Sequence, residues 1–300
     1  MDLGRIATAM VTPFDENGNI NYEVAEGIIE YLIQNGTDTI VVCGTTGETP
    51  TLSIQEKRDF IDFTIKKVNK RIPVIAGVGV NDTAYTIEAT KVVESFGADG
   101  IMVVAPFYNK PNQRGIYAHF EAISKVTNLP IVVYNVPGRT GVNIAAETTI
   151  TLSKIPNIRI VKEACGNLDQ MTEILANVSD DTFIYSGDDS LTLPLIAIGG
   201  RGVISVASHV VGNEMQAMIR AFEEGHHKKA AAIHQALLPL IKQLFANPNP
   251  VPVKYAMSKV GFNVEKVRLP LVELTDEDKA AFDQVWNTFQ EKMKKLNINS

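Results

Sequence analysis

Ile158-Arg159-Ile160-Val161-Lys162-Glu163-Ala164 has the composition of a buried parallel strand, yet it carries an ammonium group near its end. Burial disfavours the charged form of an amine. A neutral amine captures carbonyl substrates as Schiff bases, so Lys162 is the first candidate for a catalytic residue. The alternative is a Lys whose stem lines the strand while its ammonium group reaches solvent.

This stretch is one of about eight short runs rich in Val and Ile that alternate with longer amphipathic segments. Such alternation is typical of repeated βα units, and eight parallel strands close a barrel. We therefore predict an α/β fold, a (β/α)8 TIM barrel. The predicted strands are 6–14, 39–45, 73–79, 100–107, 130–137, 158–164, 182–188 and 202–208.

An open doubly wound sheet is the alternative fold, but its dinucleotide fingerprint is incomplete. Gly77-Val78-Gly79 is followed by Val80-Asn81-Asp82, so the third glycine is missing. Between the strands, residues 53–69 show apolar residues at helical spacing.

After residue 208 about 90 residues remain, more than the one helix that would complete a barrel. We predict a barrel over residues 1–225 and a C-terminal helical extension over residues 226–300, packed on the barrel. Thr275-Asp276-Glu277-Asp278 resembles a capping box and predicts the start of the last helix.

The composition argues against several classes of function. The net charge of -6 is spread along the chain without a Lys/Arg block, so neither nucleic acid nor a membrane is an expected partner. The first residues do not resemble a signal peptide, and we expect a cytoplasmic protein. The two cysteines, Cys43 and Cys165, fit a reducing compartment, although a reactive role for either stays open. Neither cysteines nor histidines form a metal-ligand pattern.

Polar loops follow several predicted strands, at the barrel end where catalytic residues lie. Gly44-Thr45-Thr46-Gly47-Glu48 combines two hydroxyls with backbone N–H groups that favour a carboxylate or phosphate. Tyr134 and Arg139 lie on one loop, where a phenol can move a proton and a guanidinium can clamp a carboxylate. Alone, each pattern also fits an ordinary turn, a buried tyrosine or a surface arginine.

Three further features allow competing interpretations. Phe107-Tyr108 is a pair of adjacent aromatics of the kind found at interfaces. The glycine-rich segments 186–189 and 199–205 could hold a phosphorylated substrate. Asp188-Asp189 could supply a general acid and base, but consecutive residues point in different directions and a helix cap fits them better.

Together these motifs resemble the 4-hydroxy-tetrahydrodipicolinate synthase (dihydrodipicolinate synthase) family of pyruvate-dependent class I aldolases. The order and spacing match essentially from end to end. The resemblance is carried by Gly44-Thr45-Thr46-Gly47-Glu48, Tyr134-Asn135-Val136-Pro137-Gly138-Arg139-Thr140-Gly141, Val161-Lys162-Glu163, Gly202-Val203-Ile204-Ser205 and Asn249-Pro250-Val251-Pro252-Val253-Lys254.

The resemblance implies a lyase that condenses pyruvate with L-aspartate 4-semialdehyde in the diaminopimelate route to lysine, without a cofactor or metal. Lys162 would form the Schiff base with pyruvate. Tyr134 would donate and accept protons, with Thr45 and Tyr108 completing its relay. In the family the tyrosine matching Tyr108 comes from a neighbouring subunit, which implies a homo-oligomer, either a tetramer built as a dimer of dimers or a dimer.

The same resemblance implies four substrate contacts. Thr46 and Ile204 would contact pyruvate, Arg139 would hold the carboxylate of the semialdehyde, and Gly187 would lie nearby. Arg139 also favours this activity over the related N-acetylneuraminate lyases, because an acidic aldehyde needs a cation that a neutral sugar does not. A barrel that binds pyruvate without turnover is the non-enzymatic alternative.

Regulation is the point where the sequence departs from part of the family. Lysine-inhibited members tend to have His, Glu and Tyr where this chain has Lys57, Tyr85 and Phe107. A second cation and a missing carboxylate should disfavour the amino group of lysine. We therefore predict weak or absent inhibition by lysine.

Overall fold

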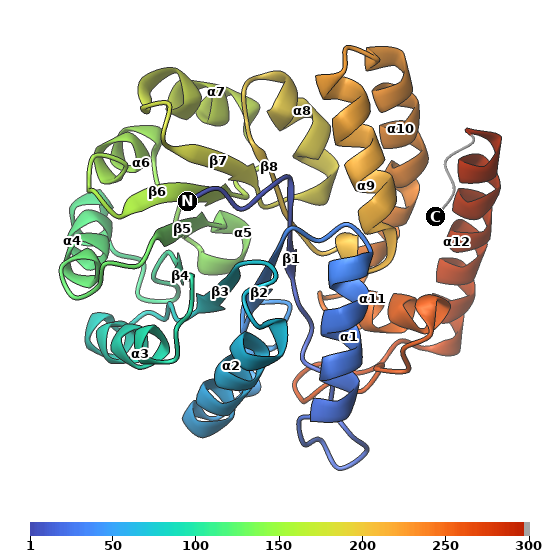
Figure 1. Ribbon diagram of the computed structural model, residues 1–300, viewed down its shortest axis with the longest axis horizontal. Helices are drawn as coiled ribbons and strands as arrows, with labels where there is room; N and C mark the ends of the chain where they lie inside the picture. The colour runs from blue at the N-terminus through green and yellow to red at the C-terminus, as the bar shows by residue number, and fades with distance from the viewer. Residues whose placement is uncertain (297–300) are drawn as a thin grey trace.

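The computed structural model describes residues 1–296 and contains a closed barrel of eight parallel strands (Figure 1). Neighbouring strands pair in sequence order, and β8 closes the barrel against β1. The predicted α/β fold, a TIM barrel with a helical C-terminal extension, is confirmed. The strands are β1 (Ile6–Ala9), β2 (Thr39–Val42), β3 (Val74–Gly77), β4 (Gly100–Val104), β5 (Ile131–Asn135), β6 (Ile158–Glu163), β7 (Phe183–Ser186) and β8 (Gly202–Ser205).

Every predicted strand contains an observed strand, but each prediction extends too far at its C-terminal end. Residues 43–45 and 105–107, for example, have already left the sheet. Most of them are apolar or buried because they form the loops at the mouth of the barrel, so hydrophobicity alone could not separate them from the strands.

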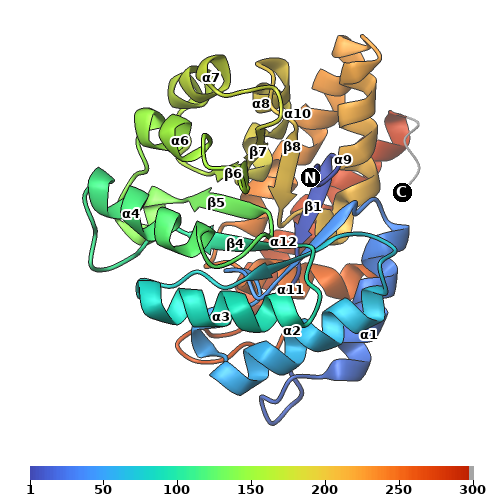
Figure 2. The ribbon, with the colours of Figure 1, turned by 60° about the vertical axis from the view of Figure 1, so that its left-hand side comes forward.

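Helices surround the barrel, and Figure 2 shows how they follow one another around it. The predicted helix 53–69 corresponds to α2 (Ile54–Val68), with Ser53 as N-cap and Asn69 as C-cap. The other helices before the extension are α1 (Tyr22–Gln34), η1 (Thr49–Thr51), α3 (Thr83–Ser95), α4 (Gln113–Ser124), α5 (Pro137–Thr140), α6 (Ala146–Leu152), α7 (Leu168–Asn177), η2 (Asp189–Leu191), α8 (Thr192–Ala197) and α9 (Ser208–Glu223).

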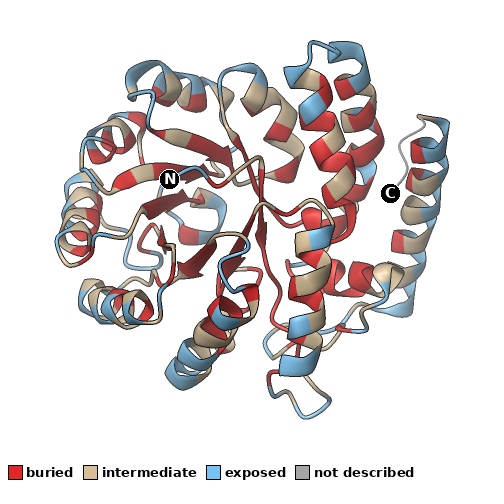
Figure 3. Ribbon diagram, in the orientation of Figure 1, coloured by how far each residue is buried: buried red, intermediate tan, exposed pale blue. Residues whose placement is uncertain are grey.

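The core has two parts because side chains alternate along each strand. A larger cluster lies between the strands and the surrounding helices. A smaller cluster fills the barrel interior and contains Val132, Tyr134, Ile160, Tyr185 and Ile204. Figure 3 shows that the strands at the centre of the molecule are mostly buried. Residues of the inner set that lie at the C-terminal strand ends are therefore positioned to line a site.

The extension consists of α10 (His227–Leu244), α11 (Val251–Ala256), η3 (Met257–Val260) and α12 (Asp276–Lys295). Helix α10 packs between α9 and α12. Thr275 and Asp278 form the capping box at the start of α12, as predicted. The predicted boundary between residues 225 and 226 falls in the turn before α10 and stays a prediction. Residues 297–300 of the predicted extension lie outside the described residues. None of the described helices combines the length and apolar character needed to cross a membrane.

Candidate active site

A cavity of about 540 Å³ opens at the C-terminal end of the barrel, where the predicted catalytic loops meet. Its walls come from the loops after β2, β5, β6, β7 and β8, and from the end of α10. The lining residues are Thr45, Thr46, Tyr134, Val136, Gly138, Arg139, Lys162, Ala164, Gly187, Asp188, Ser190, Val206, Ile241, Lys242, Phe245 and Asn249.

Lys162 and Tyr134 form the centre of this cavity. They are register partners on β6 and β5, and Tyr134 belongs to the cluster inside the barrel, so both side chains lie on the inner face of the sheet. Each residue is only 5% exposed, and the Lys162 Nζ lies 4.2 Å from the centre of the Tyr134 ring. Lys162 therefore does not extend to solvent, and its amine faces the cavity beside a phenol that can exchange protons.

Gly187 on the neighbouring loop leaves space for this amine. A Cβ atom at position 187 would lie 2.6 Å from the Cβ of Ala164 and 3.1 Å from the Cγ of Lys162. Contacts this close would displace the Lys162 side chain from its present path. Ala164 and Lys162 together explain why this position requires glycine.

A buried polar network holds β5 and β6 together directly beside Lys162 and Tyr134. The Asn135 amide donates to Glu163 Oε1 at 2.9 Å, and the backbone N–H of Cys165 donates to the same oxygen at 2.9 Å. Burial raises the pKa of Glu163, while these hydrogen bonds favour its charged form. Because Asn135 and Glu163 are also register partners, the network fixes the relative position of the two central residues.

Arg139 supplies an exposed cation at the rim of the cavity, on the short helix α5. Within residues 1–296 it forms no ion pair with a protein carboxylate. Thr45 and Thr46, in the loop after β2, also line the cavity. The cavity thus combines an amine, hydroxyl donors and a guanidinium, which suits a substrate pair that carries carboxylates.

The two consecutive acids after β7 have structural roles, which supports the helix-cap interpretation for the first of them. Asp188 caps η2 by accepting a hydrogen bond from the backbone N–H of Ser190 at 2.9 Å. Asp189 is buried, which raises its pKa, and it accepts hydrogen bonds from the backbone N–H groups of Val206 and Ala207. It therefore secures the loop after β8.

The glycine-rich segment before β8 does not support the alternative of a phosphorylated substrate. It precedes β8 and so lies at the N-terminal end of the barrel, opposite the cavity. A Cβ atom at Gly202 would lie 2.0 Å from the carbonyl oxygen of Arg5, so close packing against backbone explains this glycine.

The cysteines and histidines offer no alternative chemistry in this region. Burial raises the pKa of both Cys43 and Cys165 to about 12, which keeps them as thiols at neutral pH. His209 is buried, accepting from the backbone N–H of Val11 and contacting the carbonyl of Val206. In the described part of the chain, no three His, Cys, Asp or Glu residues are grouped so that they could hold a metal ion.

Among families of known proteins, the model of the Dihydrodipicolinate synthetase family matches residues 2–288 of this chain. The chain belongs to this family. A relative from Bacillus velezensis, named 4-hydroxy-tetrahydrodipicolinate synthase, is 52% identical over 285 residues, covering 95% of this chain and 99% of the relative.

Solved structures of dihydrodipicolinate synthases agree with this membership. The enzyme from Bacillus anthracis superposes with a TM-score of 0.94 at 51% identity, covering 96% of this chain and 98% of that one. The enzyme from Cyanidioschyzon merolae, solved with lysine bound, gives a TM-score of 0.94 at 44% identity with the same coverage.

Six of the eight residues predicted from the dihydrodipicolinate synthase motifs line the cavity: Thr45, Thr46, Tyr134, Arg139, Lys162 and Gly187. The other two lie elsewhere. Ile204 is buried in the barrel interior together with Tyr134. Tyr108 is 89% exposed, at a backbone φ of 71° in the loop after β4, and does not line the cavity of its own chain.

The sequence-based prediction missed the contribution of the C-terminal extension. Ile241, Lys242 and Phe245 reach the cavity from the end of α10, and Asn249 reaches it from the following turn. No periodicity or motif indicates this, because it depends on how the extension docks over the barrel. Asn249-Pro250 belongs to the family pattern, but the pattern alone does not place it at the cavity.

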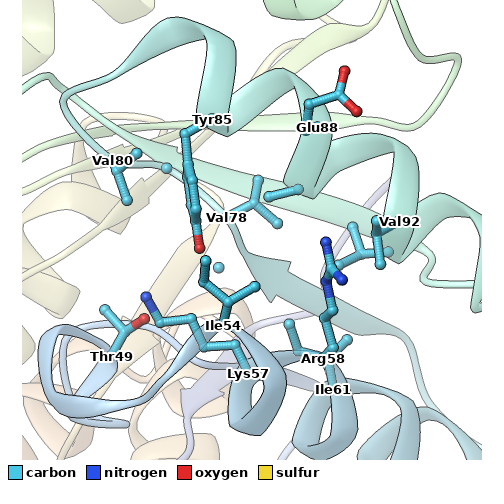
Figure 4. A pocket seen from close by; sticks show the side chains of 14 residues that line it. Thr49, Ile54, Lys57, Arg58, Ile61, Val78, Val80, Tyr85, Glu88 and Val92 are labelled. Carbon is cyan, nitrogen blue, oxygen red and sulfur yellow. The ribbon is translucent and has the colours of Figure 1, made fainter.

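A second cavity of about 200 Å³ lies between α2 and α3 and brings together two of the residues considered for lysine inhibition. Figure 4 shows Lys57 and Tyr85 entering it from the two helices. Burial lowers the pKa of Lys57, and Phe107 is not part of the lining. The half-buried amine of Lys57 is unfavourable for a second amine, but Glu88 supplies a carboxylate to the same cavity, so weak inhibition by lysine stays a prediction.

Proposed function

We propose that this chain condenses pyruvate with L-aspartate 4-semialdehyde to 4-hydroxy-tetrahydrodipicolinate, as a lyase of the diaminopimelate route to lysine. The observation that carries the proposal is the buried amine of Lys162, 4.2 Å from the Tyr134 ring in a cavity that also contains Arg139. Family membership with about 50% identity to enzymes of this name supports it.

The first half of the reaction uses the amine. Lys162 attacks the ketone carbon of pyruvate and water leaves, which gives an imine on the Nζ atom. The protonated imine withdraws electrons and acidifies the pyruvate methyl group. Tyr134, connected through Thr45 to Tyr108 of a neighbouring subunit, would remove the methyl proton to give the enamine.

The second half forms the carbon–carbon bond. The enamine carbon attacks the aldehyde carbon of the semialdehyde, and the proton relay returns a proton to the new alkoxide. The amino group of the same substrate then attacks the imine carbon and displaces Lys162, which closes the ring and restores the free enzyme. All electrons stay within the two substrates, so the sequence of steps requires no redox partner.

Substrate positions follow from the same cavity. Thr46 and Ile204 would contact the bound pyruvate, with the Thr46 hydroxyl donating to its carboxylate. Arg139 would clamp the carboxylate of the semialdehyde at the rim, where its exposed guanidinium has no competing protein carboxylate within residues 1–296.

The assembly is part of the proposal. Tyr108 is exposed beside the 37% exposed Phe107, and a non-glycine residue at φ 71° is unfavourable unless a contact rewards it. A second copy of the chain that receives Tyr108 would explain both features, as a dimer or as a tetramer built from two dimers. Sedimentation of wild type and Tyr108→Ala at micromolar protein would test whether this loop contributes to the assembly. A cytoplasmic location fits the two free cysteines.

The test is consumption of pyruvate with aspartate semialdehyde, beside the same assay with N-acetylmannosamine. We expect consumption with the semialdehyde only. Consumption with the amino sugar only would identify a lyase of the N-acetylneuraminate type. No consumption with either, while borohydride still traps a pyruvate adduct, would favour a barrel that binds without turnover.

Trapping also tests the nucleophile. Borohydride reduction in the presence of pyruvate should add one reduced adduct to the wild-type mass and none to Lys162→Ala. The exposed Lys154→Ala provides a matched control that should keep the adduct. An adduct on Lys162→Ala would refute the assignment.

A further inference from the structure

The loop that carries Thr45 and Thr46 is held from outside the barrel by the C-terminal extension. Asn249 lies in the turn after α10, and its side-chain Nδ2 donates a hydrogen bond to Thr46 Oγ1 at 3.0 Å. Both residues are buried, with exposed fractions of 7% and 2%, and both line the substrate cavity. The contact joins positions 203 residues apart in the sequence.

The direction of this bond determines what the Thr46 hydroxyl can do. A hydroxyl has one proton to donate, and an amide NH2 group can only donate. Thr46 Oγ1 therefore accepts from Asn249, and its own proton remains available. Within residues 1–296 no other group forms a hydrogen bond with this hydroxyl, so its proton is free to bind a carboxylate oxygen in the cavity.

The other end of the Asn249 amide distinguishes it from a purely structural link. Its Oδ1 is buried and has no hydrogen-bond partner among the described residues. Buried amides that only connect parts of a fold normally have both ends satisfied. Here the protein satisfies only the end that orients Thr46, and the unpaired oxygen belongs to a residue on the cavity wall.

The same extension also fixes the end of the loop. Glu48 adopts a left-handed backbone with φ of 53°, which is uncommon for a residue with a side chain. Its carboxylate is buried against the ammonium group of Lys254 and accepts from the backbone N–H of Arg268 at 3.0 Å. Thr46 and Glu48 are thus held by residues that follow α10.

We propose that Asn249 is a positioning residue for the keto-acid substrate: it orients the Thr46 hydroxyl so that its proton faces the substrate carboxylate. The inference rests on the proposed function and deepens it, because it assigns part of the pyruvate site to the C-terminal extension. It also gives the extension a role in substrate binding beyond packing on the barrel.

The test compares Asn249→Ala, Thr46→Val and the double variant. The readouts are the pyruvate concentration needed for half-maximal borohydride trapping and the KM for each substrate. Losing one hydrogen bond to a charged group should raise the pyruvate requirement roughly tenfold. The KM for the semialdehyde should stay within about twofold. In the Thr46→Val background, Asn249→Ala should add less than about twofold, because the two residues act as a unit.

Two further variants separate positioning from folding. Asn249→Asp has almost the same shape but only accepts, so it would take the Thr46 proton and should impair pyruvate binding at least as much as Asn249→Ala. Asn247→Ala is the control, because Asn247 lies in the same turn but bonds to Asp278 on α12. It should leave the pyruvate requirement unchanged.

Three results would overturn the inference: independent, multiplicative effects of Asn249→Ala and Thr46→Val, wild-type pyruvate affinity in Asn249→Asp, or an equal rise in KM for both substrates. A wild-type protein that forms no pyruvate adduct would instead overturn the proposed function, so the two failures are distinguishable.

Discussion

Replacing Lys254 by Met should destabilise the protein and loosen the loop that carries Thr46. The ion pair between Lys254 and Glu48 has side-chain exposures of 0% and 1%. The Lys254 ammonium also donates to the carbonyl of Lys266 at 2.7 Å and lies 4.3 Å from the centre of the Phe14 ring. Met keeps most of the stem and removes the charge, so the perturbation is confined to the contacts of the ammonium group.

The expected cost follows from what is left behind. Removing one partner of a buried ion pair costs roughly 3–5 kcal/mol, because the other charge remains buried. Glu48 keeps one donor, the backbone N–H of Arg268, which favours the lower end of this range. We therefore expect a loss of about 3 kcal/mol in the free energy of unfolding. Burial lowers the pKa of Lys254 to about 8 despite the nearby carboxylate, which shows that removing this ammonium group from water has a substantial free-energy cost.

Urea unfolding at one fixed protein concentration measures this change, since assembly would otherwise shift the midpoint. The matched control is Lys91→Met in α3, whose partner Glu88 is 68% exposed, and it should change little. Combining Lys254→Met with Glu48→Gln removes both charges and should recover part of the loss. The reasoning would be refuted if Lys254→Met cost no more than Lys91→Met, or if Glu48→Gln worsened it.

Three further results are expected. Arg139→Ala should raise the KM for the semialdehyde at least about tenfold and the KM for pyruvate less than about twofold, because only the carboxylate of the semialdehyde loses its contact with the guanidinium. Equal changes in the two KM values, measured by steady-state kinetics, would contradict this. A lysine titration should leave most activity at low millimolar concentration, whereas half-inhibition there would show that Lys57 and Tyr85 still permit binding. Burial lowers the pKa of His209 to about 4, so the unfolded state binds more protons between about pH 6.5 and 4, and stability falls as the pH drops through this window. His209→Gln cannot bind this proton, so between pH 7 and 4.5 its unfolding free energy should fall by about 2 to 3 kcal/mol less than that of wild type. Urea titrations at both pH values measure this difference. Equal losses in the two proteins would exclude His209 as a source of acid sensitivity.

The repeating strand pattern was enough to predict the barrel, and the unusual position of Lys162 indicated the end at which the cavity opens. Each signal can be recognised in short segments of sequence, because a strand and its end lie within one βα unit and the unit is then repeated along the chain. The strand ends were less predictable. Residues such as Ala105 are apolar and fully buried, yet they belong to loops, because the mouth of the barrel is covered by other parts of the chain.

The site itself was predictable where a side chain lies at a strand end, as for Tyr134 and Lys162. It was not predictable where long-range packing supplies the residue. Asn249 reaches Thr46 only because the turn after α10 lies beside the loop after β2, and nothing near Asn249 in the sequence indicates that contact. Tyr108 is a related case, because its proposed role requires a second copy of the chain.

The residues of the proposed mechanism differ in how firmly the fold holds them, and the difference matches their tasks. Lys162 and Tyr134 lie on adjacent strands joined by the Asn135–Glu163 hydrogen bonds, so the distance between amine and phenol is fixed before any substrate binds. Arg139 is exposed on a single-turn helix, where its guanidinium can adjust. A fixed amine and phenol suit a proton transfer that requires alignment, and an adjustable cation suits capture of the second substrate after the first has formed its imine. Changes at Asn135 should therefore lower kcat more than they raise either KM, whereas changes at Arg139 should do the reverse for the semialdehyde.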